Sequence, residues 1–444
     1  MLFSSMIKLW ELKDKKILIL GFAREGKDSF LFLRKLFPKK TIGVADKSKD
    51  LKSKIYNLRS DKNIKWHLGE NYLEALKNYD LVIKSPGIPF KILPKPTLKK
   101  ITTQTEIFFN NCPGKIVGVT GTKGKSTTAS LIYQTLKACP DLSRRAHLVG
   151  NIEKPVLSSL LRAKTNDIFV YELSSHQLYN LKKSPQIAVF LNIFPEHLDY
   201  YRNFKEYARA KANITLHQKK NDFLVFNVKD RNIREFAKKS PAQKIPIKGE
   251  YYDLNKAAAK TVGGIFKISP ETIKKTIKRF KSLPHRLELV GKFKGITFYN
   301  DSLATIPEAT IGAMEYLGRE VETIILGGLE RNIDFKNLAK KILNSKIKTL
   351  ILFPTTGEKI WKTLVRQARD EKKLPGHFFI HGAMKNSSPC AARCMQDAVK
   401  IAYKHTGKGK ICLLSAASAS FNMFRDYRER GFLFKKYVRQ MAKK

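Results

Sequence analysis

The chain has 444 residues, of which 43% are hydrophobic and 10% aromatic, so it can form packed cores and is not a disordered chain. Its 85 lysines and arginines outnumber its 38 acidic residues, which gives a net charge of +47. Its five cysteines exclude a disulfide framework, and its apolar runs are shorter than the ~18 residues that a membrane span requires.

The first hundred residues alternate between strand and helix patterns. Residues 16–22 are predicted to form a buried parallel strand, because they are an apolar run that ends in glycine. Helical spacing follows at 26–36, a second strand is expected at 41–46, and a third at 81–88 contains a Pro-Gly turn. We therefore expect an α/β domain at residues 1–103.

Two further series of strands and helices follow. The second begins with a strand at 115–120 and defines a predicted central domain at residues 104–282. The third starts near the segment Leu-Pro-His-Arg and defines a C-terminal domain at residues 283–444. Further strands are expected at 168–172, 187–192, 223–227, 323–327, 349–353 and 411–415. The predicted fold class is thus α/β with three domains: a Rossmann-like N-terminal domain, a central parallel sheet of the P-loop ATPase type and a Rossmann-like C-terminal domain.

A glycine-rich turn connects the strand at 115–120 to a predicted helix. Gly121 and Gly124 allow backbone N–H groups to face phosphate oxygens, while Lys125 can neutralise their charge and Ser126 can bind magnesium. Val119 stands where the strict phosphate-loop pattern has glycine, so a glycine-rich turn without a nucleotide is the alternative. The candidate ATP-binding residues of this turn are Gly121, Thr122, Lys123, Gly124, Lys125, Ser126 and Thr127.

The segment TGTKGKST at 120–127 resembles the corresponding loop of the Mur ligase family. Other segments are similar to motifs of that family and occur in the same order along nearly the whole chain: GNI at 150–152, YELSSHQL at 171–178, LNIFPEHLD at 191–199, YARAK at 207–211, LPHRLE at 283–288, NDSLAT at 300–305 and LGG at 326–328. The resemblance implies a ligase that uses ATP to form an amide bond through an acyl phosphate. Within the family, residues 21–29, 85–88 and 413–431 look like those of the member that adds D-glutamate to UDP-N-acetylmuramoyl-L-alanine in peptidoglycan precursor synthesis.

The resemblance also implies two Mg²⁺ sites. Glu172 ends a predicted strand beside the phosphate loop, where it would share one ion with Ser126. His197 would serve the second ion, although a purely structural histidine is the alternative. Lys211 matches a lysine that carbon dioxide carbamylates into a metal ligand, and an exposed surface cation is the alternative. Lys125, His197 and Lys211 are the candidate catalytic residues.

The remaining site residues are carried over from the family motifs. Around ATP the resemblance places Asn255, Arg286 and Asp301. Toward the UDP substrate it places Arg24, Glu25, Gly26, Asp46, Gly87, Asn151, Ser174 and Gln177. Toward glutamate it places Thr305, Arg331, Ser420 and Tyr427. The chain departs from the family pattern at Tyr251-Tyr252 near the adenine, at Leu303, which replaces a lysine, at Arg331, which replaces a lysine, and at Tyr427, which replaces phenylalanine.

The net charge of +47 leaves a second class of function open, a nucleic-acid-binding ATPase. The basic residues are spread along the chain without a basic tail, so we favour a lysine-rich surface and expect no specific nucleic-acid partner. A related ligase that uses L-glutamate or another amino acid is a further alternative. We expect a cytoplasmic monomer without a membrane span, and we attribute the spacing of Cys390 and Cys394 to chance rather than to a metal site.

Overall fold

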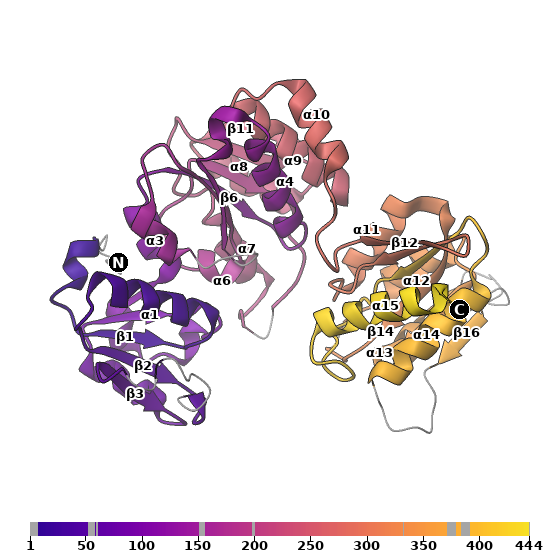
Figure 1. Ribbon diagram of the computed structural model, residues 1–444, viewed down its shortest axis with the longest axis horizontal. Coiled ribbons are helices and arrows are strands. Elements are labelled where there is room, and N and C mark those ends of the chain that lie inside the picture. The colour runs from indigo at the N-terminus through magenta and orange to yellow at the C-terminus, as the bar shows by residue number, and fades with distance from the viewer. Residues whose placement is uncertain are drawn as a thin grey trace. The chain divides into compact units, whose positions relative to one another are not determined.

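The computed structural model describes residues 8–51, 58, 61–150, 156–197, 200–331, 333–370, 379–382 and 391–443. The chain divides into two compact units, Met1–Arg279 and Phe280–Lys444, which are described separately below (Figure 1). Within the described part of the chain, none of the helices has the length and apolar character required to traverse a lipid bilayer.

The first unit begins with a five-stranded parallel sheet of order β3-β2-β1-β4-β5. Its strands are β1 (Ile17–Leu20), β2 (Ile42–Asp46), β3 (Ile64–Leu68), β4 (Leu81–Lys84) and β5 (Ile101–Thr103). Its helices are η1 (Leu9–Leu12), α1 (Arg24–Leu36), η3 (Tyr72–Asn78), η4 (Phe90–Ile92), η5 (Lys95–Lys100) and α3 (Gln104–Asn111). The three predicted strands are confirmed, but the third ends at Lys84, because Ser85-Pro86-Gly87 turns away from the sheet and proline has no N–H for the ladder.

The first unit continues with a six-stranded parallel sheet of order β11-β10-β9-β6-β8-β7. Its strands are β6 (Lys115–Thr120), β7 (Ala146–Gly150), β8 (Ile168–Glu172), β9 (Ile187–Phe190), β10 (Phe223–Asn227) and β11 (Gln243–Ile247). Its helices are α4 (Lys125–Lys137), α5 (Pro140–Ser143), η6 (Leu157–Arg162), α6 (Ser175–Leu178), α7 (Phe204–Ala212), α8 (Arg231–Lys239), α9 (Tyr251–Ile265) and α10 (Pro270–Arg279). Because β6 lies between β8 and β9, the turn after β6 opens at the middle of the sheet, where ligand sites of α/β folds form.

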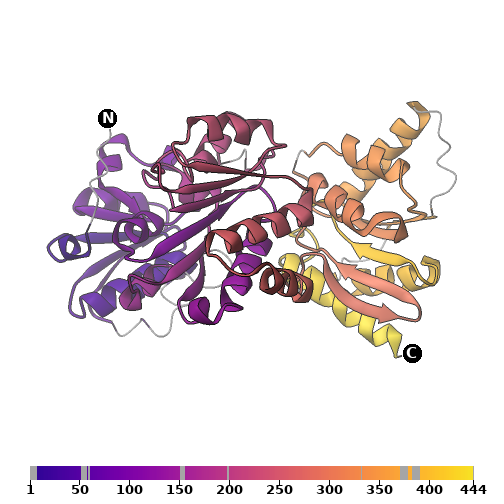
Figure 2. The ribbon, with the colours of Figure 1, turned by 90° about the horizontal axis from the view of Figure 1, so that it is seen from above.

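The second unit contains one six-stranded sheet of order β12-β13-β17-β14-β15-β16. Its strands are β12 (Glu288–Phe293), β13 (Ile296–Asn300), β14 (Val321–Gly327), β15 (Thr349–Phe353), β16 (Phe379–Gly382) and β17 (Ile411–Leu414). Its helices are α11 (Pro307–Leu317), η7 (Gly318–Glu320), α12 (Lys336–Leu343), α13 (Thr356–Asp370), α14 (Ala391–His405) and α15 (Tyr427–Ala442). Figure 2 shows α15, in yellow, beside the β12–β13 pair.

The α/β class is confirmed, with one departure from purely parallel pairing. Strands β12 and β13 are antiparallel, and positive φ angles at Lys294 and Gly295 form their tight turn. The other strand pairs described in the three sheets are parallel. The domain boundaries at residues 103 and 282 stay a prediction.

Candidate functional site

The turn between β6 and α4 is held by Asn192, which follows β9. The Thr122 N–H donates to the Asn192 carbonyl at 2.9 Å. The Asn192 side chain accepts from the Lys123 N–H at 2.8 Å and donates to the Lys123 carbonyl at 3.1 Å. The turn is therefore held in place by hydrogen bonds from the neighbouring strand end. Asn192 was missed as a site residue, although it lies in one of the segments that resemble the family.

Gly124 shows why glycine is required at the end of this turn. Its φ is +83°, and a Cβ at this position would lie 2.5 Å from Asn255 Oδ1. Asn255 is buried on α9, which packs beside α4 (Figure 1), and its Oδ1 accepts a 2.9 Å hydrogen bond from Thr128. The structure therefore brings Asn255, a predicted ATP-binding residue, into contact with the phosphate loop.

The lysines of the loop have different partners. Lys125 begins α4 and donates its Nζ to the Thr122 carbonyl at 2.8 Å. Lys123 forms a 2.9 Å ion pair with Glu196. Burial would raise the pKa of Glu196, but the charges of Lys123 and Lys125 outweigh it and lower the pKa to about 2. Glu196 is thus an ionised acid beside the loop that the sequence analysis missed, one residue before the predicted His197.

Ser126 and Glu172 form a buried pair of oxygen groups at the start of α4. The Ser126 hydroxyl donates to Glu172 Oε2 at 2.9 Å, and the two residues are 1% and 2% exposed. The position of Glu172 follows from the sheet, because β8 pairs with β6 and places Glu172 opposite Val119. A hydroxyl and a carboxylate are hard oxygen donors of the kind that Mg²⁺ prefers, so this donor set fits that ion.

Lys211 reaches the same loop from α7. Its Nζ donates to the Gly121 carbonyl at 2.8 Å and lies 4.9 Å from the centre of the Tyr207 ring. The residue is 1% exposed, and burial, together with the charge of Lys125, holds the pKa of Lys211 well below its usual range. Lys211 is therefore not the exposed surface cation that was the alternative.

His197 is half-exposed and adopts a left-handed backbone with φ of +58°. Its Nε2 lies 3.8 Å from Glu196 Oε2, and burial lowers the pKa of His197. The ring of His176, which the sequence analysis did not select, lies 4.8 Å from it. Among the described residues, no group of three or more histidine, cysteine, aspartate or glutamate side chains gathers as a metal site, so any cation would also need hydroxyl, modified or substrate oxygens.

Five of the predicted UDP-substrate residues follow or end β1, β2 and β4 of the first sheet: Arg24, Glu25, Gly26, Asp46 and Gly87. The Asp46 carboxylate accepts hydrogen bonds from the N–H groups of Phe22 at 2.8 Å and Ser48 at 2.9 Å. Gly26 permits close packing of α1, since its Cβ would lie 2.1 Å from the Gly21 carbonyl oxygen. Gly87 has open space on the side where a Cβ would stand.

Glu25 on α1 connects the part of the chain around the first sheet to α6, which follows a strand of the second sheet. It accepts a 2.7 Å hydrogen bond from Gln177, and burial raises the pKa of Glu25 to about 7.

Ser174 caps α6 through a reciprocal capping box with Gln177, so it has a clear local role in the fold. Arg24 is exposed at the start of α1, and Asn151 lies outside the described residues, as does Cys390.

In the second unit, Asp301 lies between two loops. Its carboxylate accepts hydrogen bonds from Ser415 Oγ at 2.9 Å and from the Leu287 N–H at 3.0 Å, which brings Asp301 close to the segment that contains Arg286.

The predicted glutamate-binding residues are spread over four segments: Thr305 before α11, Arg331 exposed after β14 with its guanidinium over Phe421, Ser420 buried after β17, and Tyr427 at the start of α15.

Arg430 was missed and joins two of these segments. It is fully buried, and it donates to Ser302 Oγ at 3.0 Å, to the Ser302 carbonyl at 2.7 Å and to the Ser418 carbonyl at 3.1 Å. The only sequence signal for Arg430 was that the segment at 413–431, which resembles the family, ends in an Arg-Gly pair. Arg430 thus fixes the spacing between the segment that contains Asp301 and the segment that contains Ser420.

The phosphate loop follows a strand of a parallel sheet, and the neighbouring strand carries a buried carboxylate. This combination is typical of nucleotide-binding proteins with α/β sheets. A family model described as the Mur ligase middle domain matches residues 119–301. A protein named UDP-N-acetylmuramoylalanine--D-glutamate ligase from Acetivibrio thermocellus is 34% identical to this chain, with 96% of this chain and 97% of that protein covered. A protein of the same name from Clostridium acetobutylicum is 32% identical, with 99% of each covered. The chain belongs to the Mur ligase family.

The fold agrees with this assignment. The solved structure of MurF ligase from Thermotoga maritima in complex with ADP matches with a TM-score of 0.58 and 17% identity, covering 97% of each chain. The structure of a pseudomurein peptide ligase type C from Methanothermus fervidus matches with a TM-score of 0.55 and 17% identity, covering 97% of this chain and 99% of that one.

Proposed function

We propose that this protein is an ATP-dependent ligase that joins D-glutamate to UDP-N-acetylmuramoyl-L-alanine in peptidoglycan precursor synthesis. The buried Ser126–Glu172 pair beside Lys125 is the observation that carries the chemistry, because it combines a phosphate loop with oxygen ligands for magnesium. The similarity to ligases of this name over nearly the full length supports the choice of substrates.

Amide formation in water requires an activated acyl group. The alanyl carboxylate attacks the γ-phosphorus of ATP, ADP leaves, and the resulting acyl phosphate is attacked by the amine of glutamate, which releases phosphate. The N–H groups of the loop at 121–124 and the ammonium of Lys125 would hold the phosphates and neutralise the charge that builds up during transfer. Asn255, Arg286 and Asp301 would bind the rest of ATP.

Ser126 and Glu172 would hold one Mg²⁺, and His197 with a modified Lys211 would hold another. When bound, such ions neutralise phosphate charge and orient the reacting oxygens. Burial and low pKa favour the neutral amine of Lys211, which is the form that reacts with carbon dioxide. We therefore propose that Lys211 carries a carbamate, whose negative charge would suit a cation where an ammonium would repel it.

The UDP group would bind at the carboxyl end of the first sheet, with Arg24, Glu25, Gly26, Asp46 and Gly87. The muramoyl-alanine part would extend to Asn151, Ser174 and Gln177. Glutamate would bind in the second unit, with Arg331 on its α-carboxylate and Thr305, Ser420 and Tyr427 around its side chain, because a guanidinium pairs well with a carboxylate. We propose that three domains, 1–103, 104–282 and 283–444, contribute to one reaction in a monomeric cytoplasmic enzyme.

Phosphate release tests this proposal when each component is omitted in turn. We expect release only with ATP, Mg²⁺, UDP-N-acetylmuramoyl-L-alanine and D-glutamate together, with L-glutamate inactive. Release that responds to L-glutamate would favour the related-ligase alternative. Release stimulated by DNA or RNA without the other substrates would instead favour a nucleic-acid-binding ATPase.

A further inference from the structure

The loop at residues 85–88, which follows β4, is fixed by contacts from its own sheet. Ser85 Oγ donates to the Gly21 carbonyl at 2.7 Å. Lys84 is 1% exposed, and its Nζ donates to the Ser85 carbonyl at 3.0 Å and to the Ile88 carbonyl at 2.7 Å. The carbonyl groups of Ser85 and Ile88 therefore face a buried donor of the protein.

Tyr200 holds the same loop from a segment 112 to 114 positions later in the chain. Its hydroxyl lies 3.1 Å from the Pro86 carbonyl oxygen and 3.2 Å from that of Ile88, and it donates to this pair. The backbone N–H groups of Tyr200 and Tyr201 donate to the His197 carbonyl at 3.0 and 3.1 Å. Tyr200 thus contacts the loop through its side chain and His197 through its backbone.

The conformation of His197 depends on these contacts. A φ of +58° is unfavourable for a residue with a Cβ and persists where surrounding contacts enforce it. Besides the two N–H donors, the ring of His176 lies 4.8 Å from the His197 ring and 4.3 Å from the Tyr200 ring. A shift of Tyr200 would therefore act on His197 through both its backbone and its side chain.

We propose that Tyr200 is a positioning residue that couples binding of the uridine diphosphate group at the 85–88 loop to the conformation of His197. This inference rests on the proposed function, which places Gly87 among the residues that bind the UDP group. A ligand that stabilises the loop also stabilises the hydrogen bond from Tyr200, and linkage makes the coupling reciprocal. Burial holds the pKa of Tyr200 above its usual range, so the phenol remains a donor at working pH.

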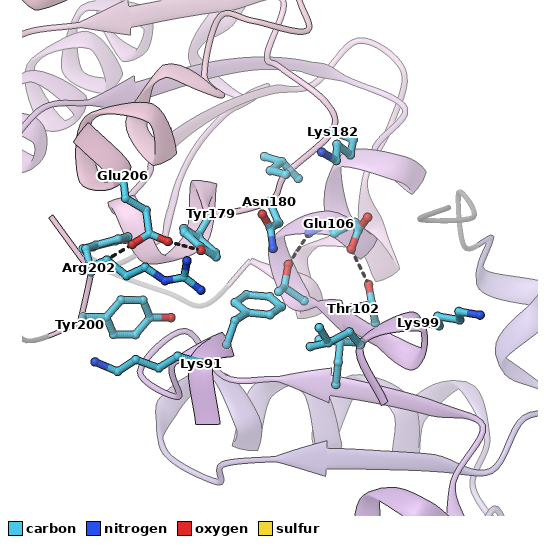
Figure 3. Close-up of a pocket in the computed structure, with 16 residues that line it drawn as sticks. Lys91, Lys99, Thr102, Glu106, Tyr179, Asn180, Lys182, Tyr200, Arg202 and Glu206 are labelled. Carbon is cyan, nitrogen blue, oxygen red and sulfur yellow. Dashed lines mark hydrogen bonds between the residues drawn. The ribbon is translucent and has the colours of Figure 1, made fainter. Parts of the chain in front are cut away.

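Tyr179 offers a matched control. Tyr179 and Tyr200 line the same cavity of about 300 Å³, which Figure 3 shows together with the hydrogen bond from Tyr179 to Glu206. That bond is 2.6 Å long and involves neither the 85–88 loop nor His197. Both Tyr→Phe substitutions keep the aromatic ring and remove one phenol donor, so they differ in which partner loses its hydrogen bond.

The first readout is binding of UDP to the metal-free protein by titration calorimetry. Tyr200→Phe should weaken UDP binding about 3- to 10-fold, the effect of losing one partly buried hydrogen bond, while Tyr179→Phe should change it less than twofold. The second readout is hydrogen exchange of backbone amides. In the parent and in Tyr179→Phe, UDP should slow exchange in peptides covering both 85–93 and 200–207, but in Tyr200→Phe only in 85–93.

The outcomes separate this coupling from the proposed function. Equal UDP affinity in all three proteins, with protection of 200–207 retained in Tyr200→Phe, would overturn the coupling and leave the ligase assignment intact. Failure of the parent to bind UDP at all would overturn the uridine assignment and the coupling with it.

Discussion

Lys211 Nζ donates a 2.8 Å hydrogen bond to the carbonyl oxygen of Gly121, across a sequence separation of 90 residues. The bond links α7 to the first residue of the phosphate loop and places the amine inside the candidate site. A carbamate keeps one N–H on this nitrogen, so the bond to Gly121 is compatible with modification. The contact therefore connects the proposed modified lysine directly to the proposed ATP site.

We expect Lys211→Ala to lose nearly all ligase activity, because the site would lose an anionic group. Formate or acetate should partly restore activity by filling the vacated space with a carboxylate. Lys211→Arg should remain inactive, since arginine retains its positive charge. The assay is phosphate release with saturating substrates. If Lys211→Arg works as well as the parent, the carbamate assignment is wrong.

Lys125→Ala should lower turnover at least 100-fold, because a fixed cation beside the transferring phosphoryl group would be lost. Binding of UDP should be unchanged, because the proposed UDP site lies at the first sheet. Lys260→Ala, at an exposed position of α9, is the matched control and should keep parental turnover. Normal turnover of Lys125→Ala would reject the phosphate-loop assignment.

The phosphate loop could be predicted because its strand, glycines and helix are contiguous in sequence. The ion pair between Lys123 and Glu196 could not, since it depends on how the segment after β9 folds back over the loop. The role of Arg430 depends on two segments that only the folded sheet brings together. The antiparallel pair β12–β13 was missed, although Lys294-Gly295 is a turn signal between two alternating segments.

Glu25 should make stability depend on pH. Burial raises the pKa of Glu25 from 4.5 to about 7, so the folded state binds the proton more tightly than the unfolded state. The contribution of protonated Glu25 to the free energy of unfolding is therefore complete below pH 4.5, and it is lost as the pH rises through 7. Relative to the parent, Glu25→Gln should therefore gain about 1–2 kcal/mol in unfolding free energy between pH 5 and pH 8.

Urea unfolding at the two pH values measures this difference. Glu74→Gln, which changes an exposed carboxyl of the same sheet region, should show no comparable trend. A Glu25→Gln variant whose stability relative to the parent is flat, or falls with pH, would show that Glu25 is ionised in the folded protein below pH 7.

Arg430→Met should destabilise the second unit by about 2–4 kcal/mol, because the buried Ser302 and Ser418 carbonyls would lose a charged donor. Arg439→Met, an exposed position on the same helix, should change stability by less than about 0.5 kcal/mol. Thermal unfolding of both variants provides the comparison. Equal midpoints would mean that Arg430 does not fix these segments.

Transfer of an oxygen isotope tests the central claim most directly. When the alanyl carboxylate of UDP-N-acetylmuramoyl-L-alanine carries ¹⁸O, an acyl-phosphate ligase must leave one of these oxygens on the phosphate that it releases. We predict one ¹⁸O per phosphate, by mass spectrometry, in a reaction that contains ATP and D-glutamate. Phosphate that carries only unlabelled oxygen would mean that water cleaves ATP, and would contradict the proposed ligase mechanism.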